Sequence, residues 1–100
     1  MMTLLFENSL GKTRVIAEMD DAQSDDETIQ DAIAEIKRFC KDRDFTVYYT
    51  RMWNTERDGA LMTQFDVGSH SEFFYLNPAV KRNYGGLTDK QIHVEYKCGS

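Results

Sequence analysis

The amino-acid sequence predicts an α+β fold, an antiparallel sheet of about five strands with one helix packed on one face. Two observations lead to this prediction. Several short runs rich in β-branched and aromatic residues are separated by turn-forming residues, and a single segment repeats apolar residues at the helical period. The order is two strands, the helix, two strands and then a C-terminal strand region. This order suits a two-layer sandwich formed by one domain over residues 1–100.

Residues 3–7 and 12–19 predict an N-terminal β-hairpin. Asn8 and Gly11 lie between the two runs, and both residue types adopt the positive φ angles that tight turns require. Alternation along the second run predicts one face with Thr13, Val15, Ala17 and Met19, and an opposite face with Arg14, Ile16 and Glu18.

The helix is predicted over residues 25–42. Ser24 and Glu27 have the spacing of a capping box, which closes the first turn of a helix. The apolar residues that follow have the spacing of one buried helix face: Ile29, Ala32, Ile33, Ile36, Phe39 and Cys40. Ile33 and Ile36 are therefore expected to be almost fully buried against the sheet.

A second hairpin is predicted from residues 45–53 and 60–67, joined by a polar loop over residues 54–59. One face of the return strand is expected to carry Leu61, Thr63, Phe65 and Val67. Gly68 then breaks the run, and residues 72–76 are expected to continue as a bent strand.

The last quarter of the chain predicts a loop and one more strand. Residues 81–89 contain Gly85-Gly86 and predict a mobile loop. Residues 91–97 alternate between apolar and polar side chains, which is typical of a strand with one buried face.

The net charge of −5 is unevenly distributed. From Glu18 to Glu35 the sequence has eight acidic residues and no lysine or arginine. Such a run repels nucleic-acid phosphate, which argues against a general DNA- or RNA-binding protein. It forms either a solvated loop and helix start or a surface for a basic protein partner. The candidate partner-binding residues are Asp20, Asp21, Asp25 and Asp26.

Several classes of protein and site are disfavoured by the sequence. No apolar run approaches the roughly 20 residues of a membrane-spanning helix, and the first residues lack signal-peptide features, which favours the cytoplasm. Cys40 and Cys98 are too few for a disulfide framework. His70 and His93 lie far apart in the chain, so neither a metal site nor a cofactor is predicted.

The best candidate ligand site lies on one predicted strand. Tyr49, Arg51 and Trp53 alternate and therefore share a face. The two rings would stack on a base while the guanidinium binds a phosphate, with His70 and Glu72 nearby as further ligand-binding residues. The alternative is an amphipathic strand whose Tyr and Trp join the core while Arg51 extends to solvent.

An enzyme is the alternative that the segment Ser69-His70-Ser71-Glu72 suggests. It holds hydroxyls, an imidazole and a carboxylate, but it lacks the second glycine of a nucleophile elbow. Asp66 and Glu72 flank Gly68 like the paired acids of a hydrolase, although nothing fixes their distance. A polar loop whose serines bond to the main chain is the simpler interpretation, so a non-enzymatic protein is favoured.

The single helix covers only one sheet face. Aromatic residues on the other face are expected to need a partner, a ligand or a second copy of the chain, and we expect a homodimer.

Three phrases of the sequence are distinctive: FENSLGK (6–12), YTRMW (49–53) and DVGSHSEFF (66–74). Together they resemble a group of small, mostly uncharacterised proteins encoded by bacteriophages and prophages. The resemblance implies an accessory protein in the cytoplasm of a host bacterium, and such proteins are often inhibitors.

The sequence thus leads to the hypothesis of a non-enzymatic binding module. Its most concrete form is a phage counter-defence protein that blocks a host immune component, as anti-CRISPR proteins do. The first alternative is a sponge that sequesters a nucleotide immune signal through Tyr49, Arg51, Trp53 and His70. The others are a small enzyme that uses His70 and Glu72, and a structural protein that dimerises.

Overall fold

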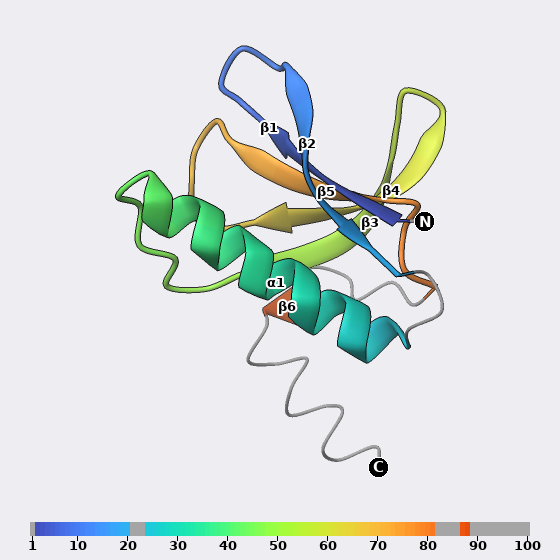
Figure 1. The fold of residues 1–100 in the computed structure, drawn as a ribbon. Coiled ribbons are helices and arrows are strands. Elements are labelled where there is room, and N and C mark those ends of the chain that lie inside the picture. Colours follow the sequence, from blue (N-terminus) through green and yellow to red (C-terminus); the bar gives the residue numbers. More distant parts are fainter. Residues whose placement is uncertain (1, 21–23, 82–86, 89–100) are drawn as a thin grey trace.

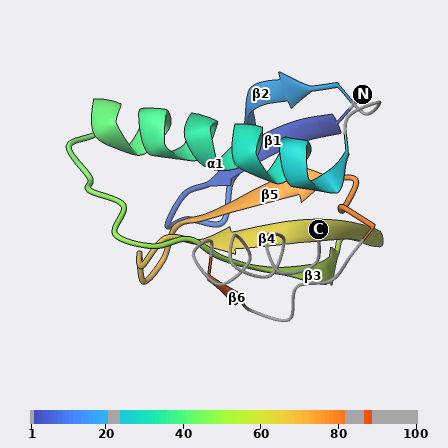
Figure 2. The same cartoon turned by 90° about the horizontal axis from the view of Figure 1, so that it is seen from below.

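The computed structural model describes residues 2–20, 24–81 and 87–88, and it confirms the α+β class (Figure 1). In these ranges six strands form one antiparallel sheet in the order β2-β1-β5-β4-β3-β6. They are β1 (Met2–Glu7), β2 (Thr13–Met19), β3 (Arg51–Arg57), β4 (Ala60–Asp66), β5 (Phe73–Asn77) and β6 (Leu87–Thr88). The helix α1 (Asp25–Asp42) forms the second layer on one face of this sheet (Figure 2).

The first hairpin forms as predicted because Asn8 organises its turn. The Asn8 side-chain oxygen accepts hydrogen bonds from the main-chain N–H groups of Leu10 and Lys12, at 2.9 and 3.0 Å. Gly11 has a φ of 80°, a conformation that glycine adopts without steric cost.

A β-bulge in this hairpin changes which side chains of β2 face the helix. Leu4 pairs with Ala17 but Leu5 pairs with Val15, so Ile16 is an extra residue. Ile16 consequently packs against the core, whereas Val15 is 53% exposed. Met19 faces the core with Ala17, as the predicted alternation requires, but Val15 does not share this face. The prediction is wrong at Val15 because the bulge interrupts the alternation of side chains along β2.

The helix begins and ends at the predicted residues. The Glu27 N–H donates to Ser24 Oγ at 3.3 Å, and the Ser24 hydroxyl donates to Glu27 Oε1 at 3.2 Å, which confirms the capping box. Ile36 is fully buried, but Ile33 is only half-buried at the edge of the helix face, so its predicted burial is wrong. In the described ranges no helix is both long and apolar enough to cross a membrane.

The core lies between α1 and the sheet, and three aromatic rings form one end of it. The Phe6 ring lies 4.7 Å from that of Phe39 and 5.3 Å from that of Phe74, measured between centroids. Fully buried side chains from four strands and the helix continue this core: Leu4, Ile36, Met52, Phe65 and Leu76.

The second hairpin forms in a different register from the predicted one. Its turn is only Asp58-Gly59, with φ angles of 51° and 80°, as in a two-residue hairpin turn. The turn extends β3 to Arg57, so the predicted loop over 54–59 is wrong, and residues 45–50 precede the strand. Leu61 is 57% exposed rather than buried because it lies beyond the stretch of β4 that pairs with β5.

The C-terminal predictions are tested at only two residues. Leu87 and Thr88 form β6, which pairs with Met52 and Arg51, so the predicted loop over 81–89 is wrong there. The strand predicted over 91–97 lies outside the described residues.

Candidate functional site

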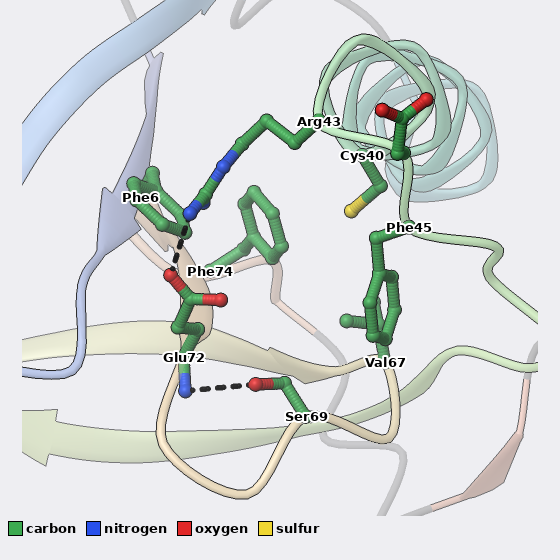
Figure 3. Close-up of a pocket in the computed structure, with 9 residues that line it drawn as sticks. Phe6, Cys40, Arg43, Phe45, Val67, Ser69, Glu72 and Phe74 are labelled. Atoms are coloured by element: carbon green, nitrogen blue, oxygen red, sulfur yellow. Dashed lines mark hydrogen bonds and ion pairs between the residues drawn. The ribbon is translucent and has the colours of Figure 1, made fainter.

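A pocket of about 140 Å³ opens where the C-terminal end of α1 meets the start of β5. Three parts of the chain that are distant in sequence line it: β1, the helix end, and the loop and strand start over 67–74 (Figure 3). The lining residues are Phe6, Cys40, Arg43, Asp44, Phe45, Val67, Ser69, Glu72 and Phe74.

The turn that follows the C-terminal end of α1 forms one wall of the pocket. Asp44 takes the left-handed conformation, with a φ of 58°, and its N–H donates to the Lys41 carbonyl at 3.1 Å. The Phe45 N–H then donates to the Cys40 carbonyl at 2.8 Å. The chain therefore turns sharply, and the Phe45 ring comes to lie beside the Cys40 side chain (Figure 3).

The opposite wall is a loop held by its own polar side chains. Asp66 Oδ1 accepts from the Gly68 N–H at 2.9 Å, and Gly68 has a φ of 93°. Ser69 Oγ accepts from the Glu72 N–H at 3.2 Å. These bonds form the turn predicted for a polar loop, and they direct the Glu72 carboxylate toward the helix end (Figure 3).

An ion pair joins the two walls. Arg43 Nη2 lies 3.0 Å from Glu72 Oε2, and both side chains are partly exposed. The Arg43 guanidinium also lies over the Phe6 ring, 4.8 Å from its centroid. A partly exposed pair contributes only about 0–1 kcal/mol to stability, so its main effect here is to fix a polar rim above an apolar floor.

The Cys40 thiol is the nucleophilic group of the pocket. Its sulfur points between the Phe45 and Phe74 rings (Figure 3). Burial raises the pKa of the Cys40 thiol above its usual value, and the nearby Glu72 charge acts in the same direction while Arg43 opposes both. The thiol is therefore protonated at neutral pH, and a protonated thiol is a poor nucleophile.

The size of the pocket limits what it holds. An engineered apolar cavity of roughly 150 Å³ accepts benzene, whereas pockets for drug-sized ligands measure about 300–1,000 Å³. One aromatic ring or one apolar side chain is therefore the fitting occupant.

A second hollow lies beside the pocket and shares the Phe45 side chain with it. It has a volume of about 470 Å³ and runs between the last turns of α1 and residues 45–47. Its lining is Lys37, Lys41, Asp44, Phe45, Thr46 and Val47. Tyr48, the residue after Val47, is 82% exposed.

The predicted ligand-binding residues are divided between two places. Glu72 lines the pocket, and His70 is exposed on the same loop but does not line it. Tyr49 lies against this loop, because a Cβ atom placed on Gly68 would be 3.5 Å from the Tyr49 hydroxyl oxygen. Arg51 and Trp53 instead lie on the sheet face away from α1, since Met52 between them is in the core.

The predicted partner-binding acids lie at the other end of the helix. Asp20 is exposed, Asp25 and Asp26 are half-buried in the first turn, and Asp21 lies outside the described residues. Asp26 Oδ1 accepts from the Gln30 amide at 3.3 Å. A helix of this length spans about 27 Å, so these acids and the pocket are separate surfaces.

Sequence reasoning missed most of the pocket. Cys40 was expected only as a buried apolar residue, and Arg43, Phe45 and Val67 were not assigned to any site. The one available signal was the helix end itself, where a thiol, a cation and an aromatic residue follow within six positions.

The described residues contain no group of three or more His, Cys, Asp or Glu side chains placed to hold a metal ion. No family model, curated protein or solved structure matches this chain. The function is therefore inferred from the pocket and its surroundings.

Proposed function

We propose that this chain is a non-enzymatic binding module that acts by occupying a protein partner. One apolar or aromatic side chain of the partner would lie in the pocket at the end of α1, with its neighbours on the Arg43–Glu72 rim. The pocket carries this proposal, because it combines a small apolar floor with a polar rim. Buried anchors of this kind, surrounded by a rim that excludes water, dominate the energetics of protein interfaces.

The energy available in the pocket favours a macromolecule over a free small molecule. Burying one large apolar side chain contributes about 1.5–3 kcal/mol. A dissociation constant of 1 mM already requires about 4 kcal/mol. The remaining affinity must come from surface outside the pocket, which a protein partner supplies and a single ring does not.

The polar groups of the pocket support binding rather than catalysis. The Cys40 thiol is protonated at neutral pH, and the Glu72 carboxylate is held by Arg43. Neither group is poised as a nucleophile or a base, which supports the choice against an enzyme using His70 and Glu72.

The narrower form of the proposal is a phage-encoded counter-defence protein that blocks a host immune component. It is supported by the resemblance of the three sequence phrases and by the acidic net charge. The nucleotide sponge has less support, because the acidic residue Asp66 lies opposite Arg51 in the register of β3 and β4, where it would repel a phosphate, and because the pocket at the end of α1 is too small for a nucleotide. Co-purification of a nucleotide with the chain would instead support the sponge hypothesis.

Affinity capture from a bacterial extract with three forms of the chain tests the proposal. Cys40→Leu adds bulk inside the pocket, and Ala34→Leu adds the same bulk at an exposed position of α1. We expect the natural chain and Ala34→Leu to retain the same protein, and Cys40→Leu to lose it. Equal retention by all three folded chains would refute a role for the pocket.

A further inference from the structure

We infer that the side chain that occupies the pocket at the end of α1 is aromatic, and that a positively charged nitrogen group of the partner lies beside it. This inference rests on the proposed function and specifies the chemistry of the partner's anchor. Three observations support it: a carboxylate oxygen that faces the pocket, the balance of charges around the pocket, and a floor made of rings and sulfur.

The Glu72 carboxylate presents one of its oxygens to the pocket. Its Oε2 atom lies 3.0 Å from Arg43 Nη2. The other oxygen, Oε1, points toward the middle of the lining residues (Figure 3), and within the described ranges it makes no hydrogen bond or ion pair. An ionised carboxylate only accepts hydrogen bonds, so the matching group of an occupant is a donor. A positively charged donor forms the stronger hydrogen bond with it.

The charged side chains around the pocket favour a cation. Two carboxylates, those of Asp44 and Glu72, line the pocket against one guanidinium, that of Arg43. Arg43 is already paired with Glu72, and the Asp44 side chain makes no ion pair in the part of the chain that the structure describes. Lys37 and Lys41 line the adjoining hollow and not this pocket. A cation is therefore the complementary charge, whereas an anion would approach two carboxylates.

The floor of the pocket favours an aromatic ring over an aliphatic chain. The rings of Phe6, Phe45 and Phe74 line it, and aromatic rings in contact gain energy beyond the area that they bury. The Cys40 side chain is only 5% exposed, and its sulfur points between Phe45 and Phe74 without a hydrogen bond in the described ranges. Because polarizable sulfur makes favourable contacts with aromatic rings, a bound ring gives this thiol a partner.

The ring and the positive charge belong close together in the partner. When the ring lies in the pocket, the Cα atom of its residue lies at the rim, where Arg43 holds the Glu72 carboxylate. The charge can then come from the α-ammonium of an N-terminal aromatic residue, or from a lysine or arginine next to an internal one. Both sources share one chemistry, a cationic nitrogen within one residue of the ring.

NMR titration of the full-length chain with three probes that share one ring tests the inference. The probes are phenylalanine amide with a free ammonium, neutral N-acetyl-phenylalanine amide, and N-acetyl-phenylalanine with a free carboxylate. At about pH 6.5 the ammonium is protonated and the carboxylate is ionised. We expect the dissociation constant to rise about threefold from the ammonium to the neutral probe, and again to the carboxylate probe. Tighter binding of the carboxylate probe than of the neutral one would overturn the inference.

Further probes distinguish the sources of the charge. N-acetyl-phenylalanyl-lysine amide carries the charge on the next side chain and is compared with its glutamine counterpart. Tighter binding of the lysine probe would assign the charge to an internal basic residue of the partner. Tighter binding of phenylalanine amide alone would assign it to the partner's N-terminus. No gain from either charge would overturn the inference, as would an equal gain for N-acetyl-tyrosine amide, whose donor is a neutral hydroxyl.

Removal of the Glu72 charge should abolish the preference for a cation. Glu72→Gln keeps the size of the side chain and leaves one carboxylate and one guanidinium around the pocket. We expect this variant to bind the cationic and neutral probes about equally. Glu35→Gln is the matched control, because Glu35 is also a partly exposed partner of an arginine but does not line the pocket. It should keep the preference, and equal effects of the two variants would overturn the inference.

The proposed function and this inference can fail separately. Binding of the ring in the pocket without any charge preference would overturn the inference alone. Retention of the captured protein by Cys40→Leu would refute the proposed function, whatever the charge preference of the probes. Binding of none of the probes would overturn both.

Discussion

The guanidinium of Arg57 lies over the ring of Tyr75, 4.7 Å from the ring centroid, on the sheet face that α1 leaves open. Arg57 also forms an ion pair with Glu7, and the Tyr75 hydroxyl donates to the Glu7 carboxylate at 3.3 Å. Tyr75 is consequently only 6% exposed although α1 lies on the other face of the sheet. The chain therefore covers part of its own open face, which weakens the main reason to expect a homodimer. The homodimer itself stays a prediction, which light scattering would test.

Removing the Arg57 side chain should destabilise the fold through Tyr75. Arg57→Ala uncovers the ring and leaves Glu7 without its ion-pair partner. We expect a loss of about 1–2 kcal/mol in the free energy of unfolding, measured by urea denaturation. The matched control is Arg38→Ala, which removes an exposed helical ion pair with Glu35 and should cost at most about 0.5 kcal/mol. Equal losses would show that Arg57 does not cover the ring.

Substitutions in α1 should destabilise the fold by different amounts, according to how deeply each side chain is buried. Ile36 is fully buried, so Ile36→Ala should lower the free energy of unfolding by about 2–5 kcal/mol. Ile33 is half-buried, and Ile33→Ala should cost less. Ser24→Ala removes the helix cap and should cost about 1 kcal/mol. An unchanged midpoint for Ile36→Ala would mean that α1 does not pack against the sheet through this face.

The stability of the fold should decrease at alkaline pH because of Tyr75. Burial, followed by the negative charge of Glu7, raises the pKa of Tyr75 above its usual value, and both outweigh the opposing effect of Arg57. The unfolded chain thus loses this proton first. The contribution of Tyr75 is complete below about pH 10 and is lost as the pH rises through the folded-state pKa.

The measurement is the free energy of unfolding of the natural chain and of Tyr75→Phe on both sides of about pH 10. Phenylalanine fills the same space and does not ionise. We expect the steeper alkaline decrease in the natural chain, and parallel profiles would contradict the burial of the hydroxyl.

The Cys40 thiol should react slowly in the folded chain. Its side chain is buried and its pKa is raised, so little thiolate forms at neutral pH. In a Cys98→Ser background, iodoacetamide should modify Cys40 at least about tenfold more slowly in the folded than in the unfolded chain. Rapid modification of the folded chain would indicate an activated thiol and would favour the enzymatic alternative.

The elements that sequence analysis predicted well depend on local interactions. The helix is set by Ser24 and by a continuous apolar face, and the first turn by Asn8 and Gly11, all within a few residues. The second hairpin was misplaced because strand propensity was given more weight than the Asp58-Gly59 turn. That turn fixes the register, while residues 45–50 have no neighbouring strand among the described residues.

The pocket could not be predicted from the sequence because it depends on tertiary structure. Phe6, Cys40 and Glu72 come from three separate parts of the chain and meet only when α1 packs on the sheet. Glu72 was among the predicted ligand-binding residues and lines the pocket, but its ion pair with Arg43 could not be predicted, because no local pattern connects the two residues.

Occupation of the pocket by a partner side chain is tested most directly by NMR titration with N-acetyl-phenylalanine amide. This probe has the chemistry of an aromatic anchor without the rest of a partner. We expect the largest shift changes at the Val67 methyl groups and the Phe74 ring, with millimolar or weaker affinity. The changes should be absent in Cys40→Leu and present in Ala34→Leu. Shift changes located elsewhere, or unaltered by Cys40→Leu, would contradict the assignment of this pocket as the binding site.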